Sequence, residues 1–529
     1  MSHQAPATSI NILHRYGAYL AAFLIAVLFC LYTYGLSENP PGFYRDESAF
    51  AYNAYLIAKT GAGEFGVHWP LYFQNFTGPF TNYANPVAIY LLAGFYLVLP
   101  PSIWLSRLLS ATAGFEAAIL LGLLAFRISR DRTIGIIVRL TALITPWFFE
   151  VSRLFFDSSF YPLALALFLL SLYSASTKDR WTWGNITKVA LTLALLTYTY
   201  TIGRLLAPLL ALGLIFFVTS KGRLVDVIRT WIAYGLTLIP LLVFNLRHPG
   251  MLTSRFLTLT YLYAEPTLPA RIWRFVTRYF QDLSMWGLLT SGDGNPRHHV
   301  PGATGSMLAA PFILALIGIL IVVTRHRGDP WWRFIIFGAL ASVIPAALTV
   351  DPFHTGRMIA YPVFLLVLNI PALKWLLGQD TKVEKPSEIS AANQSRLELL
   401  RKRPRALRRQ ALLIVFLLAT IGQAAYFQMI FWREGPNREY LFDVAYKHVY
   451  DVATTMPSRP IYLVDGKMGP GYIHALWYAL LEERDASEFV HLDYGVSPPP
   501  GALVISSEQN CTTCEVLFTS GQFFLYRKR

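Results

Sequence analysis

Long apolar segments constrain the fold of this chain more than any other feature of its sequence. A helix needs about 20 mostly apolar residues to cross the roughly 30 Å of hydrocarbon in a bilayer. Only 14% of the 529 residues are charged, whereas soluble proteins average about 25%. We therefore predict an all-α membrane bundle of about eleven transmembrane helices, near residues 16–37, 103–126, 133–151, 157–176, 186–202, 205–219, 224–245, 304–324, 332–350, 357–377 and 411–432.

Basic residues indicate how these segments are oriented. Lys and Arg gather in cytoplasmic loops, and the basic segments fall on one face with the N-terminus if the short, proline-bounded stretch 85–101 does not cross. We predict that 85–101 is an interfacial or re-entrant helix and that 48–60 is a second interfacial helix. The opposite, extracytoplasmic face then receives residues 38–102, 150–157, 246–303, 351–357 and 433–529.

The chain is predicted to divide into two domains. Residues 1–432 form a multi-pass domain in the cell membrane, in which 379–410 is a cytoplasmic basic linker that can bind anionic lipid. Residues 433–529 form a small extracytoplasmic α/β domain. The net charge of +14 belongs mostly to the basic loops, and without a recognisable basic module it does not indicate nucleic-acid binding.

The tail carries the pattern of that α/β domain. Residues 460–466, 501–507 and 514–529 are rich in β-branched and aromatic residues, which is typical of strands. Residues 471–484 have the periodicity of an amphipathic helix. The one CxxC pair, Cys511 and Cys514, favours a local disulfide over zinc, which would need more ligands.

An acidic pair, Asp46 and Glu47, follows the first apolar segment on the predicted outer face. A solvated loop explains such a pair as well as a catalytic role does. In the functional interpretation, one carboxylate is a general base beside the membrane and the other orients it, because a nearby like charge raises a carboxyl pKa towards a useful value.

Other charged residues also stand at the predicted outer ends of spans. Arg153 and Asp157 are four residues apart, so they can pair across a helical turn, or Asp157 can approach the acidic pair while Arg153 holds it. Arg204 either snorkels to the interface or binds an anion. Ionisable groups at such positions are costly and are therefore functional candidates.

The richest outer loop is "SGDGNPRHHVPGATG" (291–305). Its Arg297, His298 and His299 can donate hydrogen bonds to a phosphate. With Asp293 the histidines could also ligate a metal, but a third spaced ligand is lacking, so we predict no metal site and leave a divalent cation open. Further basic residues stand in two other outer segments, at Arg247, His248, Arg255, His354 and Arg357.

These motifs resemble those of the glycosyltransferases with the GT-C fold, and most closely the group of protein O-mannosyltransferases and lipid A aminoarabinose transferases. The resemblance rests on the Asp46–Glu47 pair, the "SR…D" at 152–157, the arginine after "YTY" at 204 and the turn at 354–357, and it covers residues 10–435. Members of this family transfer sugar from a polyprenyl-phosphate carrier outside the cytoplasm. The resemblance implies that Asp46 is the catalytic base. The segment 82–90, "NYANPVAIY", departs from the family's motif.

We therefore predict an inverting glycosyltransferase with a polyprenyl-phosphate-linked sugar as donor and a protein, lipid or glycan as acceptor. The catalytic candidates are Asp46, Glu47 and Asp157, and the candidates that bind substrate are Arg153, Arg204, Arg255, Arg297, His298, His299, His354 and Arg357. A transporter or flippase of a lipid-linked sugar is the alternative, although such proteins place charges near the midplane of the bilayer. A membrane scaffold would explain the tail but not the converging arginines.

Overall fold

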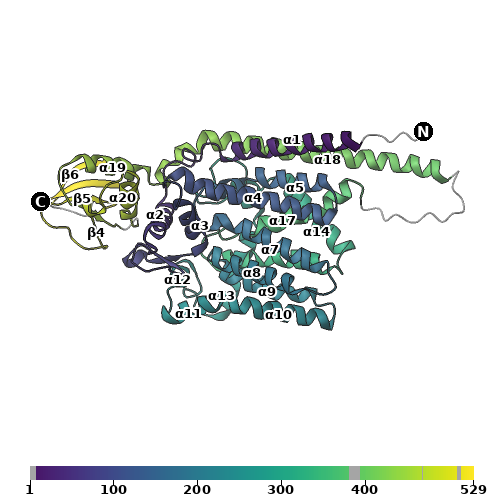
Figure 1. The fold of residues 1–529 in the computed structure, drawn as a ribbon, viewed down its shortest axis with the longest axis horizontal. Helices are drawn as coiled ribbons and strands as arrows, with labels where there is room; N and C mark the ends of the chain where they lie inside the picture. The colour runs from purple at the N-terminus through teal and green to yellow at the C-terminus, as the bar shows by residue number, and fades with distance from the viewer. Residues whose placement is uncertain (1–6, 380–393, 467–468, 509–513) are drawn as a thin grey trace.

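The computed structural model of the protein describes residues 7–379, 394–466, 469–508 and 514–529. A body of helices carries, at the end of the molecule where the C-terminus lies, a small domain built on a sheet (Figure 1). The helices of the body are α1 (Ala7–Thr33), α2 (Arg45–Thr60), α3 (Pro86–Tyr96), α4 (Ile103–Ser129), α5 (Arg132–Ile144), α6 (Pro146–Ser152), α7 (Tyr161–Ser176), α8 (Trp183–Thr199), α9 (Gly203–Gly213), α10 (Lys221–Thr237), α11 (Ile239–Arg247), α12 (Ser254–Leu259), α13 (Leu268–Asp282), α14 (Ala309–Arg325), α15 (Pro330–Ala341), α16 (Ile344–Ala347), α17 (Tyr361–Leu376) and α18 (Gln394–Glu434).

The apolar helices make this a multi-pass membrane protein, but they do not confirm the predicted number of spans. Within the described residues, five helices are long and apolar enough to cross a bilayer, and a sixth is added if α5 and α6, bent by 58°, form one span. Other apolar segments form shorter helices. Proline contributes to this difference, because it begins α6 and lies inside α9 and α17, where it removes a backbone hydrogen bond.

The first outer loop contains the two short helices that the sequence predicted. Helix α2 begins at Arg45 and ends at Thr60, and Gly61 after it adopts the left-handed conformation that terminates helices. Helix α3 has 11 residues and rises only about 16 Å, half of what a span needs. Between them lies a hairpin of β1 (Phe73–Asn75) and β2 (Asn82–Ala84), which the sequence did not predict.

A second outer segment, predicted only as a loop, also contains helices. Helix α13 is strongly amphipathic, with Ile272, Trp273 and Phe280 exposed on one side. Its three arginines interrupt the apolar pattern, which is why hydropathy alone does not identify it. Helix α12 lies just before it and reaches the candidate site described below.

The C-terminal domain has the predicted α/β character. Its sheet has the strand order β4-β3-β5-β7-β6, in which β3 (Ile461–Val464) runs parallel to both β4 (Phe489–Leu492) and β5 (Leu503–Ser506). Strands β6 (Cys514–Ser520) and β7 (Phe523–Lys528) complete it in antiparallel fashion. Two helices, α19 (Val444–Thr455) and α20 (Tyr472–Leu481), pack on the sheet. Cys514 is disulfide-bonded; Cys511 lies outside the described residues.

One apolar core joins the C-terminal domain to the first outer loop. Buried side chains of α2 and α3 pack together with those of α19, α20 and the sheet, and the rings of Phe43 and Trp477 stack with their centroids 5.4 Å apart. The long helix α18 leads into this domain and begins at Gln394, so residues 394–410 of the predicted linker are helical and lead into the last candidate span, Leu407–Glu434. These residues are rich in Leu, Arg and Gln, which favour helix.

Candidate active site

A cavity of about 870 Å³ opens between the outer loops. Its walls come from the start of α2, the β1–β2 hairpin, α12 and the loops before α7, α9, α14 and α17. It brings together eight of the eleven predicted site residues: Asp46, Asp157, Arg204, Arg255, Arg297, His298, His354 and Arg357. Residues more than 300 positions apart in the chain therefore share one polar space.

Asp46 lies in the first turn of α2, where the positive end of the helix dipole favours a carboxylate. Burial in the cavity wall raises the pKa of Asp46 above its ordinary value, although the positive charges of Arg255 and Arg297 act in the opposite direction. Among the described residues its carboxylate accepts no hydrogen bond from the protein, so it is open to a ligand in the cavity. A carboxylate in this setting can accept a proton.

Asn85 links a second acid of the cavity, Asp157, to an arginine. Its Nδ2 donates to Asp157 Oδ2 at 2.7 Å and to Thr201 Oγ1 at 3.1 Å. Its Oδ1 accepts from Arg204 Nη2 at 2.9 Å. Asn85 lies in the segment 82–90 that departs from the family's motif, and no pattern in the sequence singles it out. This chain of hydrogen bonds fixes Asp157 relative to Arg204.

Most cavity arginines keep their charge available to a ligand. Arg357 donates to Asp351 Oδ2 and Thr349 Oγ1, both at 2.7 Å. Arg204, Arg255 and Arg297 pair with no carboxylate in the described part of the chain. The guanidinium of Arg297 lies 3.7 Å from the ring centroid of Tyr44, and that of Arg204 lies 4.6 Å from that of Tyr72. Three such cations suit an anion with several oxygens, such as a phosphate.

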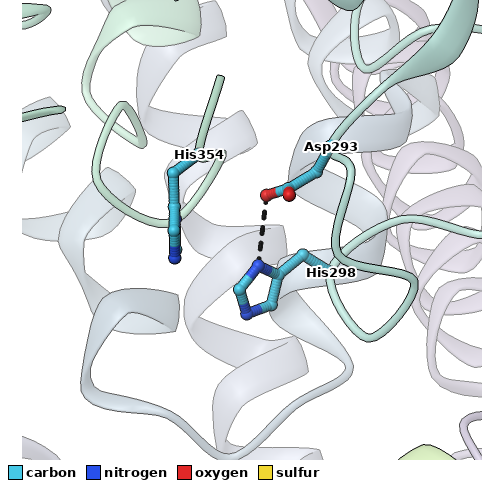
Figure 2. Close-up of side chains that lie close together, drawn as sticks. All are labelled: Asp293, His298 and His354. Atoms are coloured by element: carbon cyan, nitrogen blue, oxygen red, sulfur yellow. Dashed lines mark hydrogen bonds and ion pairs between the residues drawn. The ribbon is translucent and has the colours of Figure 1, made fainter. Parts of the chain in front are cut away.

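A cluster that could hold a metal ion lines the same cavity. The ligand atoms of Asp293, His298 and His354 lie within 4.8 Å of one another, and Figure 2 shows the two histidine rings and the carboxylate close together. His298 Nδ1 is 3.1 Å from Asp293 Oδ2, which also accepts from the backbone N–H of Thr355 at 2.8 Å. The sequence provided two of these donors close together, and His354 supplies the third from a distant loop.

The protonation states in this cluster suit a divalent cation. Burial lowers the pKa of His354, as do the charges of His298 and Arg357, so its imidazole stays neutral. Burial alone would raise the pKa of Asp293, but the hydrogen bond and charge of His298 hold it below its ordinary value. The neutral imidazole of His354, the imidazole of His298 and the carboxylate of Asp293, with room left for a further ligand, form a donor set that zinc and similar ions accept.

Glu47 does not line the cavity. Its carboxylate forms a two-pronged ion pair with Arg107, with Nε–Oε1 at 3.0 Å and Nη2–Oε2 at 2.9 Å, and both side chains are fully buried. It also accepts from the backbone N–H groups of Tyr44 and Phe155. Both carboxylate oxygens of Glu47 therefore already accept hydrogen bonds from the protein. Arg107 was not predicted from the sequence, although a lone arginine within an apolar segment needs a partner and is therefore a signal.

Arg153 and His299 are also enclosed by the protein. Arg153 donates to the backbone carbonyls of Tyr32, Tyr34 and Asn39 rather than to Asp157, because α6 ends at Ser152 and the expected helical turn does not form. His299 lies between Glu150 Oε2 and the carbonyl of Thr304, each 2.6 Å away. Both side chains brace the loops that form the cavity.

Solved structures with the same fold are known, whereas no family model and no curated protein sequence matches the chain. ArnT from Cupriavidus metallidurans bound to undecaprenyl phosphate is 11% identical, with a TM-score of 0.55 over 98% of each chain. The apo state of that protein is 13% identical, with a TM-score of 0.56 over 97% of this chain and 98% of the other.

An archaeal protein shares the same architecture. The oligosaccharyltransferase AglB from Archaeoglobus fulgidus, in complex with an inhibitory peptide and a dolichol-phosphate, is 15% identical, with a TM-score of 0.53 over 89% of this chain and 64% of its own. The chain therefore has the GT-C fold, and the likeness to ArnT includes the C-terminal domain because it extends over nearly the whole chain.

Proposed function

We propose that the protein is a membrane glycosyltransferase that moves a sugar from a polyprenyl-phosphate-linked donor to an acceptor on the extracytoplasmic face. The observation that carries this proposal is the shared cavity, in which an open carboxylate, Asp46, faces the same space as three arginines that pair with no carboxylate among the described residues. The lipid phosphates bound to ArnT and AglB support a donor of this class.

The arginines would hold the phosphate of the donor. Arg204, Arg255 and Arg297 come from three different segments and line one cavity, so a phosphate between them can accept hydrogen bonds from several directions. Negative charge builds on the phosphate oxygen as its bond to the sugar breaks. Fixed positive charge that is already in place stabilises that transition state more than it stabilises the bound donor.

Asp46 would act on the acceptor. Its carboxylate takes the proton from an acceptor hydroxyl or amine, and the freed electron pair attacks the anomeric carbon of the sugar. The bond from that carbon to the phosphate oxygen breaks, and polyprenyl phosphate leaves with the electron pair. Attack opposite the phosphate inverts the anomeric centre. Asp157, held by Asn85, orients the acceptor or the sugar.

The cluster of Asp293, His298 and His354 would hold a divalent cation near the phosphate. Such a cation supplies further positive charge to the leaving group. His298 follows Arg297 directly, and His354 precedes Arg357 by three residues, so the cluster shares its loops with these two arginines.

Release of polyprenyl phosphate tests the proposed reaction. Purified protein in liposomes is supplied with a panel of polyprenyl-phosphate monosaccharides and a membrane extract as the source of acceptor. We expect wild-type protein to release polyprenyl phosphate, and Asp46→Asn to be slower by about 10²–10⁴-fold because a general base contributes that much. Asp451→Asn, at an exposed ion pair of the C-terminal domain, is the matched control.

Two outcomes would contradict the proposal. Near wild-type release by Asp46→Asn would remove Asp46 as the base. Movement of intact sugar-lipid across the bilayer without any release would instead identify a transporter of the same ligand.

A further inference from the structure

The C-terminal domain contacts helix α2, which carries Asp46, through an ion pair. Asp443 of that domain accepts from Arg45 at both carboxylate oxygens, from Nε and from Nη2, each at 3.3 Å. Gln522 Nε2 donates to the same carboxylate at 3.2 Å. Arg45 is the first residue of α2 and precedes Asp46 directly. The partner of Arg45 therefore lies 398 residues away, in the other domain.

A second contact fixes the same turn of α2. His474 Nε2 is 3.1 Å from Asp443 Oδ2, and its Nδ1 is 3.0 Å from Ser48 Oγ. Ser48 lies one helical turn after Arg45, and the residues between them are Asp46 and Glu47. His474 and Asp443 are both buried, so the C-terminal domain grips the first turn of α2 on either side of Asp46.

The loops of the C-terminal domain are shaped to fit this contact. Asp443 adopts the left-handed conformation, with φ of 54°, which is uncommon for a residue other than glycine. Gly469, with φ of +119°, approaches so closely that a Cβ there would collide with the guanidinium of Arg45. A side chain at Gly469 would therefore displace Arg45 from its place beside Asp443.

The ion pair between Asp443 and Arg45 affects the ionisation of Asp46, because several charged groups lie close to that carboxylate. Those that act on it are Arg45 on its own helix, Arg255 on α12, Arg297 on the loop before α14, Asp443 from the C-terminal domain, and Asp157 across the cavity. Glu47 is paired with Arg107, whereas Asp443 pairs with Arg45. Without the negative charge of Asp443, the positive charge of the mostly buried Arg45 would be offset less and would stabilise the ionised form of Asp46 more strongly.

We infer that Asp443 is a positioning residue for Asp46: the C-terminal domain neutralises Arg45 outside the cavity, and Asp46 keeps the basicity that proton abstraction requires. This inference rests on the proposed role of Asp46 as a base. It gives the C-terminal domain a part in the reaction without any contact between that domain's Asp443 and the substrate.

Carbodiimide labelling tests the inference without any turnover. Dicyclohexylcarbodiimide modifies protonated carboxyl groups, so the extent of labelling at Asp46, measured by mass spectrometry across a pH series, reports the pH at which Asp46 ionises in the full-length protein. In Asp443→Asn a negative charge near Asp46 is lost, and the charge of Arg45 is no longer offset by it. Both effects favour the ionised form of Asp46, so we expect its labelling midpoint to fall by about 1 pH unit.

Two further variants separate positioning from folding. Arg45→Gln removes the cation and should raise the midpoint, which keeps the test open if Asp443→Asn does not fold. The double variant Arg45→Gln/Asp443→Asn removes both charges and should return the midpoint close to that of wild type. Asp451→Asn, at the exposed pair with Lys447, should leave the midpoint unchanged.

Unchanged midpoints in both single variants would overturn the inference, and so would a double variant that does not return towards wild type. A failure of the proposed function has a different signature, because release of polyprenyl phosphate would then persist in Asp46→Asn whatever the labelling midpoints are.

Discussion

Two sets of arginines lie near the predicted outer ends of the helices, and they differ in what surrounds them. The buried arginines, Arg107 and Arg153, are fully enclosed and donate to Glu47 and to backbone carbonyls of residues 32–42. The cavity arginines, Arg204, Arg255 and Arg297, line an open space and pair with no carboxylate among the described residues. The same residue type thus holds the loop together in one place and is available to an anion in the other.

The difference shows that position alone does not distinguish a structural arginine from one that binds ligand. What distinguishes them is whether the protein already satisfies the donors. A guanidinium has five N–H donors and seeks acceptors for them when water is excluded. Replacing a buried arginine should therefore affect stability, whereas replacing a cavity arginine should affect activity.

The largest effect should come from the buried pair of Arg107 and Glu47. Arg107→Gln leaves the carboxylate of Glu47 buried without its partner, and breaking such a pair costs about 3–5 kcal/mol. We expect a large fall in the midpoint of thermal unfolding in detergent, measured by tryptophan fluorescence. An Arg255→Gln variant, in which an exposed side chain is replaced, should unfold like wild type. Equal stability of the two variants would contradict the structural role of the buried arginine.

The reverse pattern should appear in activity. Arg255→Gln removes a charge that stabilises the leaving phosphate, and we expect a loss of about 10²-fold in kcat with little change in unfolding. The measurement is the rate of polyprenyl phosphate release in liposomes. Arg247→Gln, at an exposed arginine outside the cavity, is the matched control. Full activity in Arg255→Gln would remove this residue from the phosphate site.

The metal cluster, like the cavity arginines, should be available to bind a ligand. Wild-type protein dialysed against Zn²⁺ and then buffer should retain about one ion per molecule, measured by elemental mass spectrometry. His354→Ala removes one of the three protein ligands and should lose that ion, whereas His248→Ala, which lies outside the cluster, should keep it. Equal zinc content in the two variants would show that the cluster is not the binding site.

A smaller effect is expected at a neutral group of the cavity. Asn75 is buried and lines the cavity, and its Oδ1 has no hydrogen-bond partner within the described residues. A sugar hydroxyl can donate to it. One such bond contributes about 1 kcal/mol, so Asn75→Ala should reduce the preference for a polyprenyl-phosphate sugar over bare polyprenyl phosphate by about fivefold. The preference is measured by competition binding. An unchanged preference in Asn75→Ala would contradict a hydrogen bond from the sugar to Asn75.

The sequence predicted the membrane fold, the α/β tail and the outer-loop residues that gather at the cavity. Those inferences depend on local information, because apolar length and the position of charges along the chain can be observed directly. Asp46 and Asp157 were both found because each stands beside the end of an apolar segment. The predicted number of spans fared worse, since prolines and bends divide several apolar segments into shorter helices.

The partners of the charged residues were not predictable in this way. Glu47 and Arg107 are 60 residues apart, and neither position indicates the other. His354 joins Asp293 and His298 only because two distant loops meet. Asp443 lies in the tail, which the sequence analysis treated as a separate domain without a site. Each of these contacts depends on tertiary packing, which a single sequence does not encode in any local pattern.

Mass spectrometry of the lipids that co-purify with the protein shows whether the cavity holds a lipid-linked phosphate. We expect polyprenyl phosphate, or its sugar adduct, in wild-type protein, and its loss from a folded variant that carries Arg204→Gln, Arg255→Gln and Arg297→Gln together. Wild-type protein without any such lipid, or the same lipid content in the variant, would contradict the claim that the cavity arginines hold a lipid-linked phosphate.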